Sequence, residues 1–286
     1  MALLFNQQIT TQIIPGGSSI EVLGKHLVLI GDDAKYLGVY NYNFELTTKV
    51  QLWDSENVSI EKKKKADLEA SFILTKNNVE TLQILGSGSK GEKRNWLLEV
   101  TEKGEGYHVE KYYNPPIYEI LKTSTNEKIN IEAAELINNI IWLGNRGNKL
   151  APNNYFVGFN YANFPNNNAA HALKINIPTH KVPFGISGLY LHKKSQIVYA
   201  TFSSEDTEDA YLDGAIGPSA IATFNLADFN TTNTQITPTS FEVLDNLYSQ
   251  LRGQKIESIC VYNNQLVFVA DNDNQESSLF VFDIIP

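Results

Sequence analysis

The sequence predicts an all-β protein that folds as a single β-propeller of five blades. Five successive units open on an apolar residue followed by a carboxylate or a serine, at Ile20-Glu21, Leu68-Glu69, Ile131-Glu132, Ile186-Ser187 and Ile256-Glu257. The openings recur about every 59 residues, a period longer than that of helical repeats and typical of propeller blades with long loops. A sixth blade within residues 101–130, lacking such an opening, is the alternative.

Each opening leads into runs of β-branched and aromatic residues bounded by Gly, Asn, Asp, Ser or Pro, which is the pattern of strands separated by turns. Second strands are expected at 26–33, 81–87, 139–146, 196–201 and 265–271. Third strands are expected at 36–42, 95–100, 155–160, 220–225 and 279–283, and fourth strands at 48–53, 107–112, 172–177 and 239–244. One short helix is indicated at 115–122, where two prolines precede apolar residues.

The last unit ends at Pro286 after only three strands. We therefore expect residues 3–14 to supply its outer strand by pairing with residues 279–283, because an open edge would leave a row of backbone groups unpaired.

The composition excludes several classes of protein. With 286 residues, 42% of them apolar, the chain can bury a large core, and we expect one domain over residues 1–286. A net charge of −9 argues against binding to nucleic acid, and the basic run from Lys62 to Lys65 is expected to be a solvated loop rather than an anion-binding or membrane patch. No apolar segment has the length of a signal peptide or a membrane span, so we expect a soluble, cytoplasmic monomer. The single cysteine, Cys260, is expected to be buried and inert.

Polar residues are expected to converge at one end of the propeller channel, because the first strand of each blade begins there and the second strand returns to it. The strand openings contribute Glu21, Glu69, Glu132, Ser187 and Glu257. The candidate ligand-binding set comprises Asp32, Asp67, Glu69, Ser87, Glu132, Asn145, Arg146, Glu205, Asp206, Glu257, Asp271 and Asp273, with Asp33 beside it. A role in bracing neighbouring blades is the structural alternative for each of these residues.

Several carboxylates around one opening repel each other unless a cation, protons or Arg146 offset their charge. Oxygen ligands of this kind suit Ca²⁺, and Glu69, Glu132 and Glu257 are the candidate ligands. Zinc is disfavoured because the five histidines show no paired ligand spacing.

A resemblance to a known family extends over roughly residues 18–285. The segments that carry it are 65–70, 130–134, 143–148, 204–214 and 255–258, including Asp67-Leu-Glu69 and Leu143-Gly-Asn-Arg146. They resemble an uncharacterised family of bacterial proteins that is itself distantly similar to phytase-like (esterase-like) propellers. The resemblance implies a propeller and implies no activity.

Two classes of function stay open. The first, which we favour, is a propeller that binds a small molecule or a cation at the acidic mouth of its channel. The second is a Ca²⁺-dependent hydrolase of phosphoesters or lactones. In the hydrolase, Glu69, Glu132, Asn145, Asp271 and Asp273 would hold the ion, another carboxylate would act as general base, and Arg146 would face an anionic group.

Overall fold

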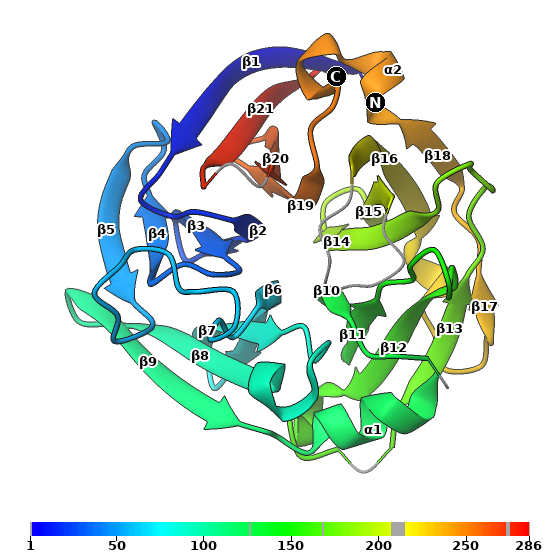
Figure 1. The fold of residues 1–286 in the computed structure, drawn as a ribbon, viewed down its shortest axis with the longest axis horizontal. Helices are drawn as coiled ribbons and strands as arrows, with labels where there is room; N and C mark the ends of the chain where they lie inside the picture. The colour runs from blue at the N-terminus through cyan, green and yellow to red at the C-terminus, as the bar shows by residue number, and fades with distance from the viewer. Residues whose placement is uncertain (1, 126, 168, 207–214, 273–274, 286) are drawn as a thin grey trace.

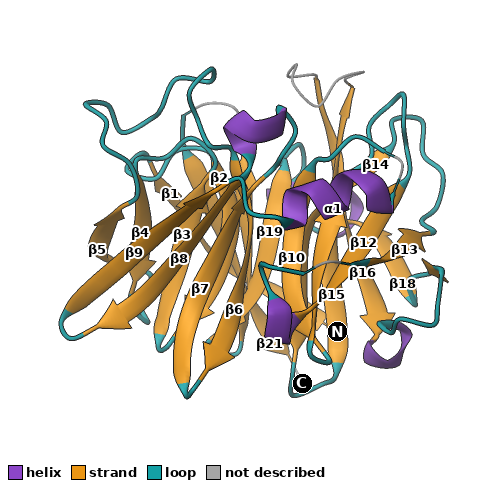
Figure 2. Ribbon diagram, turned by 90° about the horizontal axis from the view of Figure 1, so that it is seen from below, coloured by secondary structure: helices purple, strands orange, loops and turns teal. Residues whose placement is uncertain are grey.

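The computed structural model describes residues 2–125, 127–167, 169–206, 215–272 and 275–285. Five sheets are arranged in a ring around one central axis, as Figure 1 shows, so the prediction of a five-bladed propeller is confirmed. Residues 101–125 hold the end of one blade and a helix rather than a sixth blade. In the side view of Figure 2 the strands run between two faces, where loops connect them.

In the first four blades the strands follow chain order from the centre outward. The first blade contains β2 (Gly17–Leu23), β3 (His26–Gly31), β4 (Tyr36–Tyr40) and β5 (Leu46–Gln51), and the second contains β6 (Leu68–Lys76), β7 (Val79–Gly86), β8 (Trp96–Lys103) and β9 (Gly106–Tyr113). The third contains β10 (Ile131–Ile137), β11 (Ile140–Asn145), β12 (Asn154–Asn160) and β13 (His171–Ile175). The fourth contains β14 (Phe184–His192), β15 (Ile197–Asp206), β16 (Ala215–Asn225) and β18 (Ser240–Val243).

The fifth blade closes the ring in the way that the sequence predicts. It contains β19 (Ile256–Tyr262), β20 (Gln265–Asp271) and β21 (Ser277–Ile285), and the N-terminal strand β1 (Ala2–Thr11) forms its outer edge. The strands β1 and β21 pair antiparallel from Ala2 opposite Ile285 to Thr11 opposite Ser277. The first and last segments of the chain therefore share one sheet.

One pairing was not predicted. The short strand β17 (Gln235–Ile236) comes from the fourth unit but pairs in parallel with β13 of the third blade. This pairing joins the outer edges of two neighbouring blades.

The helical segments lie between strands. The predicted helix is present as α1 (Ile117–Ser124), with Pro116 at its N-terminus. The others are one turn or shorter: α2 (Leu244–Leu247), η1 (Gly91–Arg94), η2 (Tyr161–Asn163), η3 (Leu226–Asp228) and η4 (Ser249–Leu251). No helix in the described part of the chain is both long enough and apolar enough to cross a membrane.

Tight turns connect the inner strand of each blade to the second. In three blades the turn is an Asn-Asn pair with both residues in the left-handed region, for example Asn138 (φ 53°) and Asn139 (φ 61°). Asparagine tolerates this conformation, and a two-residue turn of this type matches the twist of the flanking strands. The local sequence therefore sets the register of these hairpins.

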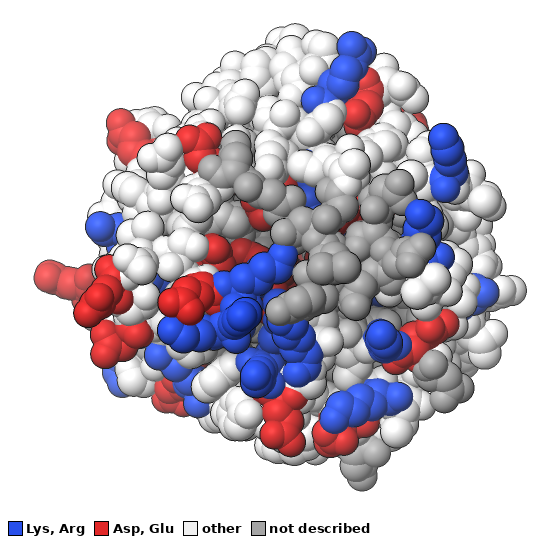
Figure 3. Space-filling model, in the orientation of Figure 1, with Lys and Arg blue, Asp and Glu red and all other residues white. Residues whose placement is uncertain are grey.

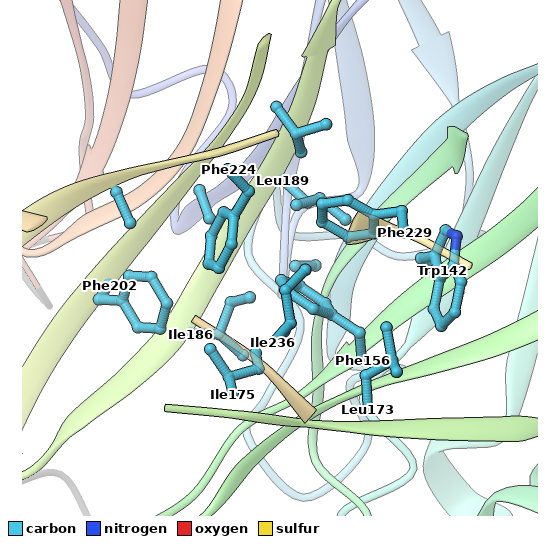
Figure 4. Close-up of a cluster of buried hydrophobic side chains, with 14 of the residues drawn as sticks. Trp142, Phe156, Leu173, Ile175, Ile186, Leu189, Phe202, Phe224, Phe229 and Ile236 are labelled. Carbon is cyan, nitrogen blue, oxygen red and sulfur yellow. The ribbon is translucent and has the colours of Figure 1, made fainter. Parts of the chain in front are cut away.

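The hydrophobic core is divided among the interfaces between blades. Five clusters of buried side chains each join two neighbouring blades. Figure 4 shows the cluster between the third and fourth blades, where Phe156 makes an edge contact with Phe224 and a tilted contact with Phe229. Cys260 is fully buried in the cluster between the first and fifth blades, as predicted.

A β-bulge interrupts the ladder near the start of every inner strand. The bulged residues are Glu69, Glu132, Ser187 and Glu257 in four blades, and Ser18 in the first blade. A bulge adds one residue to one strand and redirects its side chain. The sequence-based alignment of the first unit is therefore wrong by three residues: Ser18, not Glu21, is equivalent to the other openings.

Candidate ligand-binding site at the channel mouth

The bulged ends of the inner strands open into a polar cavity of about 250 Å³. Figure 3 shows acidic and basic side chains beside each other at the centre of this face. The charged residues that line the cavity are Asp32, Asp33, Asp67, Glu69, Glu132, Glu205, Glu257 and Asp271, together with Lys62, Lys65, Arg94, Arg146, Lys149 and Lys255. The mouth therefore carries both signs of charge rather than a ring of carboxylates alone.

Asp67 organises one side of the cavity. Its carboxylate accepts hydrogen bonds from Ser87 and Arg94, and its Oδ1 lies 3.0 Å from Nζ of Lys65, which also contacts Asp32. Burial opposes the charge of Lys65, but the carboxylates of Asp32, Asp67 and Glu69 raise its pKa above the usual value. The expectation of a solvated loop is wrong at Lys65, whose side chain is only 12% exposed.

Three carboxylates on this side could hold a cation. Oxygens of Asp32, Asp67 and Glu69 all lie within 4.8 Å of one another. Burial, together with the charges of Glu132, Asp67 and Asp32, raises the pKa of Glu69 well above its usual value. Among the residues described, none forms a hydrogen bond or an ion pair with the Glu69 carboxylate.

Arg146 organises the opposite side. Its Nη1 lies 3.6 Å from Glu132 Oε2 and 3.7 Å from Glu257 Oε2, and it donates to the hydroxyl of Ser203 at 3.0 Å. Lys255 Nζ lies 3.0 Å from Glu257 Oε1. Burial raises the pKa of Glu132 to about 7, although Arg146 favours the charged form. A Cβ atom at Gly185 would come within 2.4 Å of Arg146 Nε, so glycine leaves room for the guanidinium.

The structure brings most of the predicted site residues to this cavity. Those that line it are Asp32, Asp67, Glu69, Glu132, Arg146, Glu205, Glu257 and Asp271. Ser87 and Asn145 are buried beside it instead: Ser87 donates to Asp67, and Asn145 accepts from the backbone N–H of Asn130 at 2.8 Å. Asp273 and the side chain of Asp206 lie outside the described residues.

Sequence reasoning missed Lys65, Arg94 and Lys255, which supply much of the positive charge. The sequence does contain a signal for Lys255. It lies two residues before the bulged carboxylate of its strand, the position that Asp67 and Asn130 occupy in the second and third blades. Arg94 could not have been found in this way, because it belongs to η1 and reaches Asp67 only through the fold.

A second acidic pair lies deeper in the molecule. Glu21 and Glu135 are each three residues beyond the bulge of their inner strand, where the fourth and fifth blades place Tyr190 and Cys260. Glu135 accepts hydrogen bonds from the backbone N–H groups of Leu136 (2.7 Å) and Leu191 (2.9 Å). Burial raises the pKa of Glu135 to about 7, and burial followed by the charge of Glu135 raises the pKa of Glu21 well above 4.5.

These shifts predict that the free energy of unfolding falls as pH rises above the usual carboxyl pKa of 4.5. Carboxyls whose pKa is higher in the folded state contribute stability that is complete below the unfolded pKa and is lost as pH rises through the folded pKa. The slope approaches about 1.4 kcal/mol per pH unit for each proton. Urea unfolding from pH 5 to pH 8 should therefore show Glu21→Gln stabilising the protein increasingly with pH. The exposed control Glu56→Gln should show no such trend, and a constant difference for Glu21→Gln would contradict the prediction.

Comparison with known proteins now places the chain in a family. Residues 13–284 match the profile described as "Family of unknown function (DUF6929)". The chain belongs to this family. No curated protein shows significant sequence similarity to it. The similarity of DUF6929 to phytase-like propellers stays a prediction.

Solved structures of similar shape are β-propellers with little sequence identity to this DUF6929 chain. The glutaminyl cyclase of Myxococcus xanthus is 9% identical, with coverage of 99% of this chain and 97% of that one and a TM-score of 0.56. A glycosyl hydrolase from Bacteroides ovatus is 9% identical, with coverage of 94% and 84% and a TM-score of 0.51. At such identities the similarity shows the fold alone.

Proposed function

We propose that the cavity at the channel mouth binds a small ligand through a positively charged group that contacts Glu69 and Glu132. This proposal rests on one observation: the Glu69 carboxylate lines the cavity and has no hydrogen-bond or ion-pair partner among the described residues. Burial and the neighbouring carboxylates raise the pKa of Glu69, although the charge of Lys65 opposes the shift, and a cationic ligand would favour the charged carboxylate. Because burial raises the pKa of Glu132 to about 7, this second carboxyl can also change its charge to suit the ligand near neutral pH.

An organic ammonium group fits the site better than Ca²⁺. The ammonium of Lys65 already contacts Asp32 and Asp67, two of the three carboxylates whose oxygens converge, so a metal ion would have to displace it. Arg146 lies between Glu132 and Glu257 and provides an internal counter-charge for both. The carboxylates of Glu69, Glu132 and Glu257 are therefore poorly placed to share one ion.

Calorimetric titration with small primary amines, CaCl₂ and MgCl₂ tests this proposal. We expect an amine to bind and the substitution Glu69→Gln to weaken its binding at least about tenfold, the loss typical of a charge-assisted hydrogen bond. The exposed control Glu56→Gln should bind as the parent does. If Ca²⁺ gives heat of binding and no amine does, the site binds a metal ion and not an ammonium group. No heat from any arm would refute the proposal.

A metal-dependent hydrolase of phosphoesters or lactones is the second candidate, supported by the burial that raises the pKa of Glu132 to about 7. Asp32, Asp67 and Glu69 would hold a Ca²⁺ ion, which when bound would polarise the oxygen of the scissile bond. Glu132 would take a proton from the attacking water, and Arg146 would face the anionic part of the substrate. Ca²⁺-dependent hydrolysis that is lost in Glu132→Gln, found by screening such esters, would favour this candidate over binding alone.

A further inference from the structure

Basic side chains gather at one edge of the cavity, on the second blade. Lys62 lines the cavity from the loop before β6, and Lys90 and Lys93 lie at the short helix η1. We call Lys62, Lys90 and Lys93 the lysine rim. Figure 3 shows basic side chains concentrated beside the acidic centre of this face. In a chain of net charge −9, this concentration contrasts with the overall charge.

The residues of the lysine rim repel one another. Partial burial and the charges of Arg94, Lys93 and Lys62 lower the pKa of Lys90, although the carboxylate of Asp67 opposes the shift. In the described part of the chain, neither the side chain of Lys93 nor that of the neighbouring Lys63 forms an ion pair, and both residues are exposed. The grouped positive charge favours an anion, and grouped lysines are common phosphate-binding groups.

Fixed ion pairs hold the acidic and basic parts of the site close together. Glu69 is on β6, and Asp67, two residues earlier, pairs with both Lys65 and Arg94. Arg94 ends η1, which carries Lys93, so the contact between Asp67 and Arg94 attaches the lysine rim to the strand that presents Glu69. Lys62, Arg94 and Glu69 line the same cavity, whose volume of about 250 Å³ suits a small molecule.

We propose that the ligand is a small dipolar molecule, with a cationic group directed to Glu69 and an anionic group, carboxylate or phosphate, held by Lys62, Lys90 and Lys93. The cationic half rests on the proposed function, and the anionic half is independent of it. The basic run of the sequence then contributes to binding: Lys65 supports the acidic groups, and Lys62 receives the anion.

The test compares ethanolamine, inorganic phosphate, acetate and phosphoethanolamine by calorimetric titration at constant ionic strength. The parent should bind phosphoethanolamine at least about tenfold more tightly than either ethanolamine or phosphate, because linking two binding groups makes the second contact intramolecular. Acetate in place of phosphate shows whether the rim prefers a carboxylate. The variant with Lys62→Gln, Lys90→Gln and Lys93→Gln should lose that advantage and the binding of phosphate.

A matched control removes the same charge from the opposite face. Lys25→Gln, Lys76→Gln and Lys103→Gln combine three exposed lysines of the hairpin turns and should leave all affinities unchanged. Equal phosphate binding by the two triple variants would show that the lysine rim does not bind the anionic group. If ethanolamine binds but neither phosphate nor acetate does, anion binding by the lysine rim is refuted, whereas the proposed function is not. Rim-dependent phosphate binding without ethanolamine binding would instead overturn the proposed function, and with it the dipolar ligand.

Discussion

Deletion of residues 1–11 is expected to lower the free energy of unfolding by on the order of 5 kcal/mol, and the melting temperature by roughly 10 °C. The deletion removes β1, whose inward residues Leu3 and Phe5 pack on the cluster between the fourth and fifth blades. Phe5 lies edge to face with Phe282 at 5.4 Å between ring centroids. The deletion also exposes the backbone edge of β21, and an exposed strand edge favours aggregation.

Differential scanning calorimetry and size-exclusion chromatography of the truncated protein measure both effects. A peptide comprising residues 1–14, added in trans, should restore part of the melting temperature. The single substitution Leu4→Ser is the control, because Leu4 lies on β1 but is 58% exposed. A truncated protein that is as stable and monomeric as the parent would show that the ring does not need β1.

The substitution Arg146→Met is expected to destabilise the protein by about 3–5 kcal/mol at pH 8, the cost of leaving buried charges without their partner. The guanidinium is the counter-charge of both Glu132 and Glu257, whose side chains are 13% and 6% exposed. At pH 5 the loss should be smaller, because Glu132, with a pKa of about 7, is then protonated. Urea unfolding at the two pH values measures the difference.

Two further variants separate charge from packing. The double variant Arg146→Met with Glu132→Gln should recover part of the stability at pH 8, and the exposed control Arg252→Met should change little at either pH. An equal loss at pH 5 and pH 8 would mean that the hydrogen bonds of Arg146 with Ser203 matter more than its charge.

Local sequence accounts for most of the fold. The recurring strand openings, the runs of β-branched and aromatic residues bounded by turn residues, and the missing last strand predicted the blades and their closure, because each depends on neighbouring residues or on edge pairing. The parallel pairing of β17 with β13 escaped prediction. Two residues are too few to show a period, and their partner belongs to another unit.

The candidate site was predicted in outline and not in its charge balance. The recurring carboxylates marked Glu69, Glu132 and Glu257, but an apolar residue followed by glutamate also occurs at Ile20-Glu21, which lies three residues beyond the bulge. Sequence similarity between units cannot detect a bulge, since an extra residue is defined only by the strand that it faces.

The sequence by itself determined the all-β class and the ring closure, and it favoured five blades and marked Glu69, Glu132 and Glu257 at strand starts, because these follow from periodicity and from strand geometry. Only the tertiary structure decided which charges meet. Lys65 joins Asp32 to Asp67, Arg146 joins Glu132 to Glu257, and Arg94 reaches Asp67 from η1. Ion pairs form across blades according to distance and burial, which depend on how the sheets pack around the channel and not on spacing along the chain.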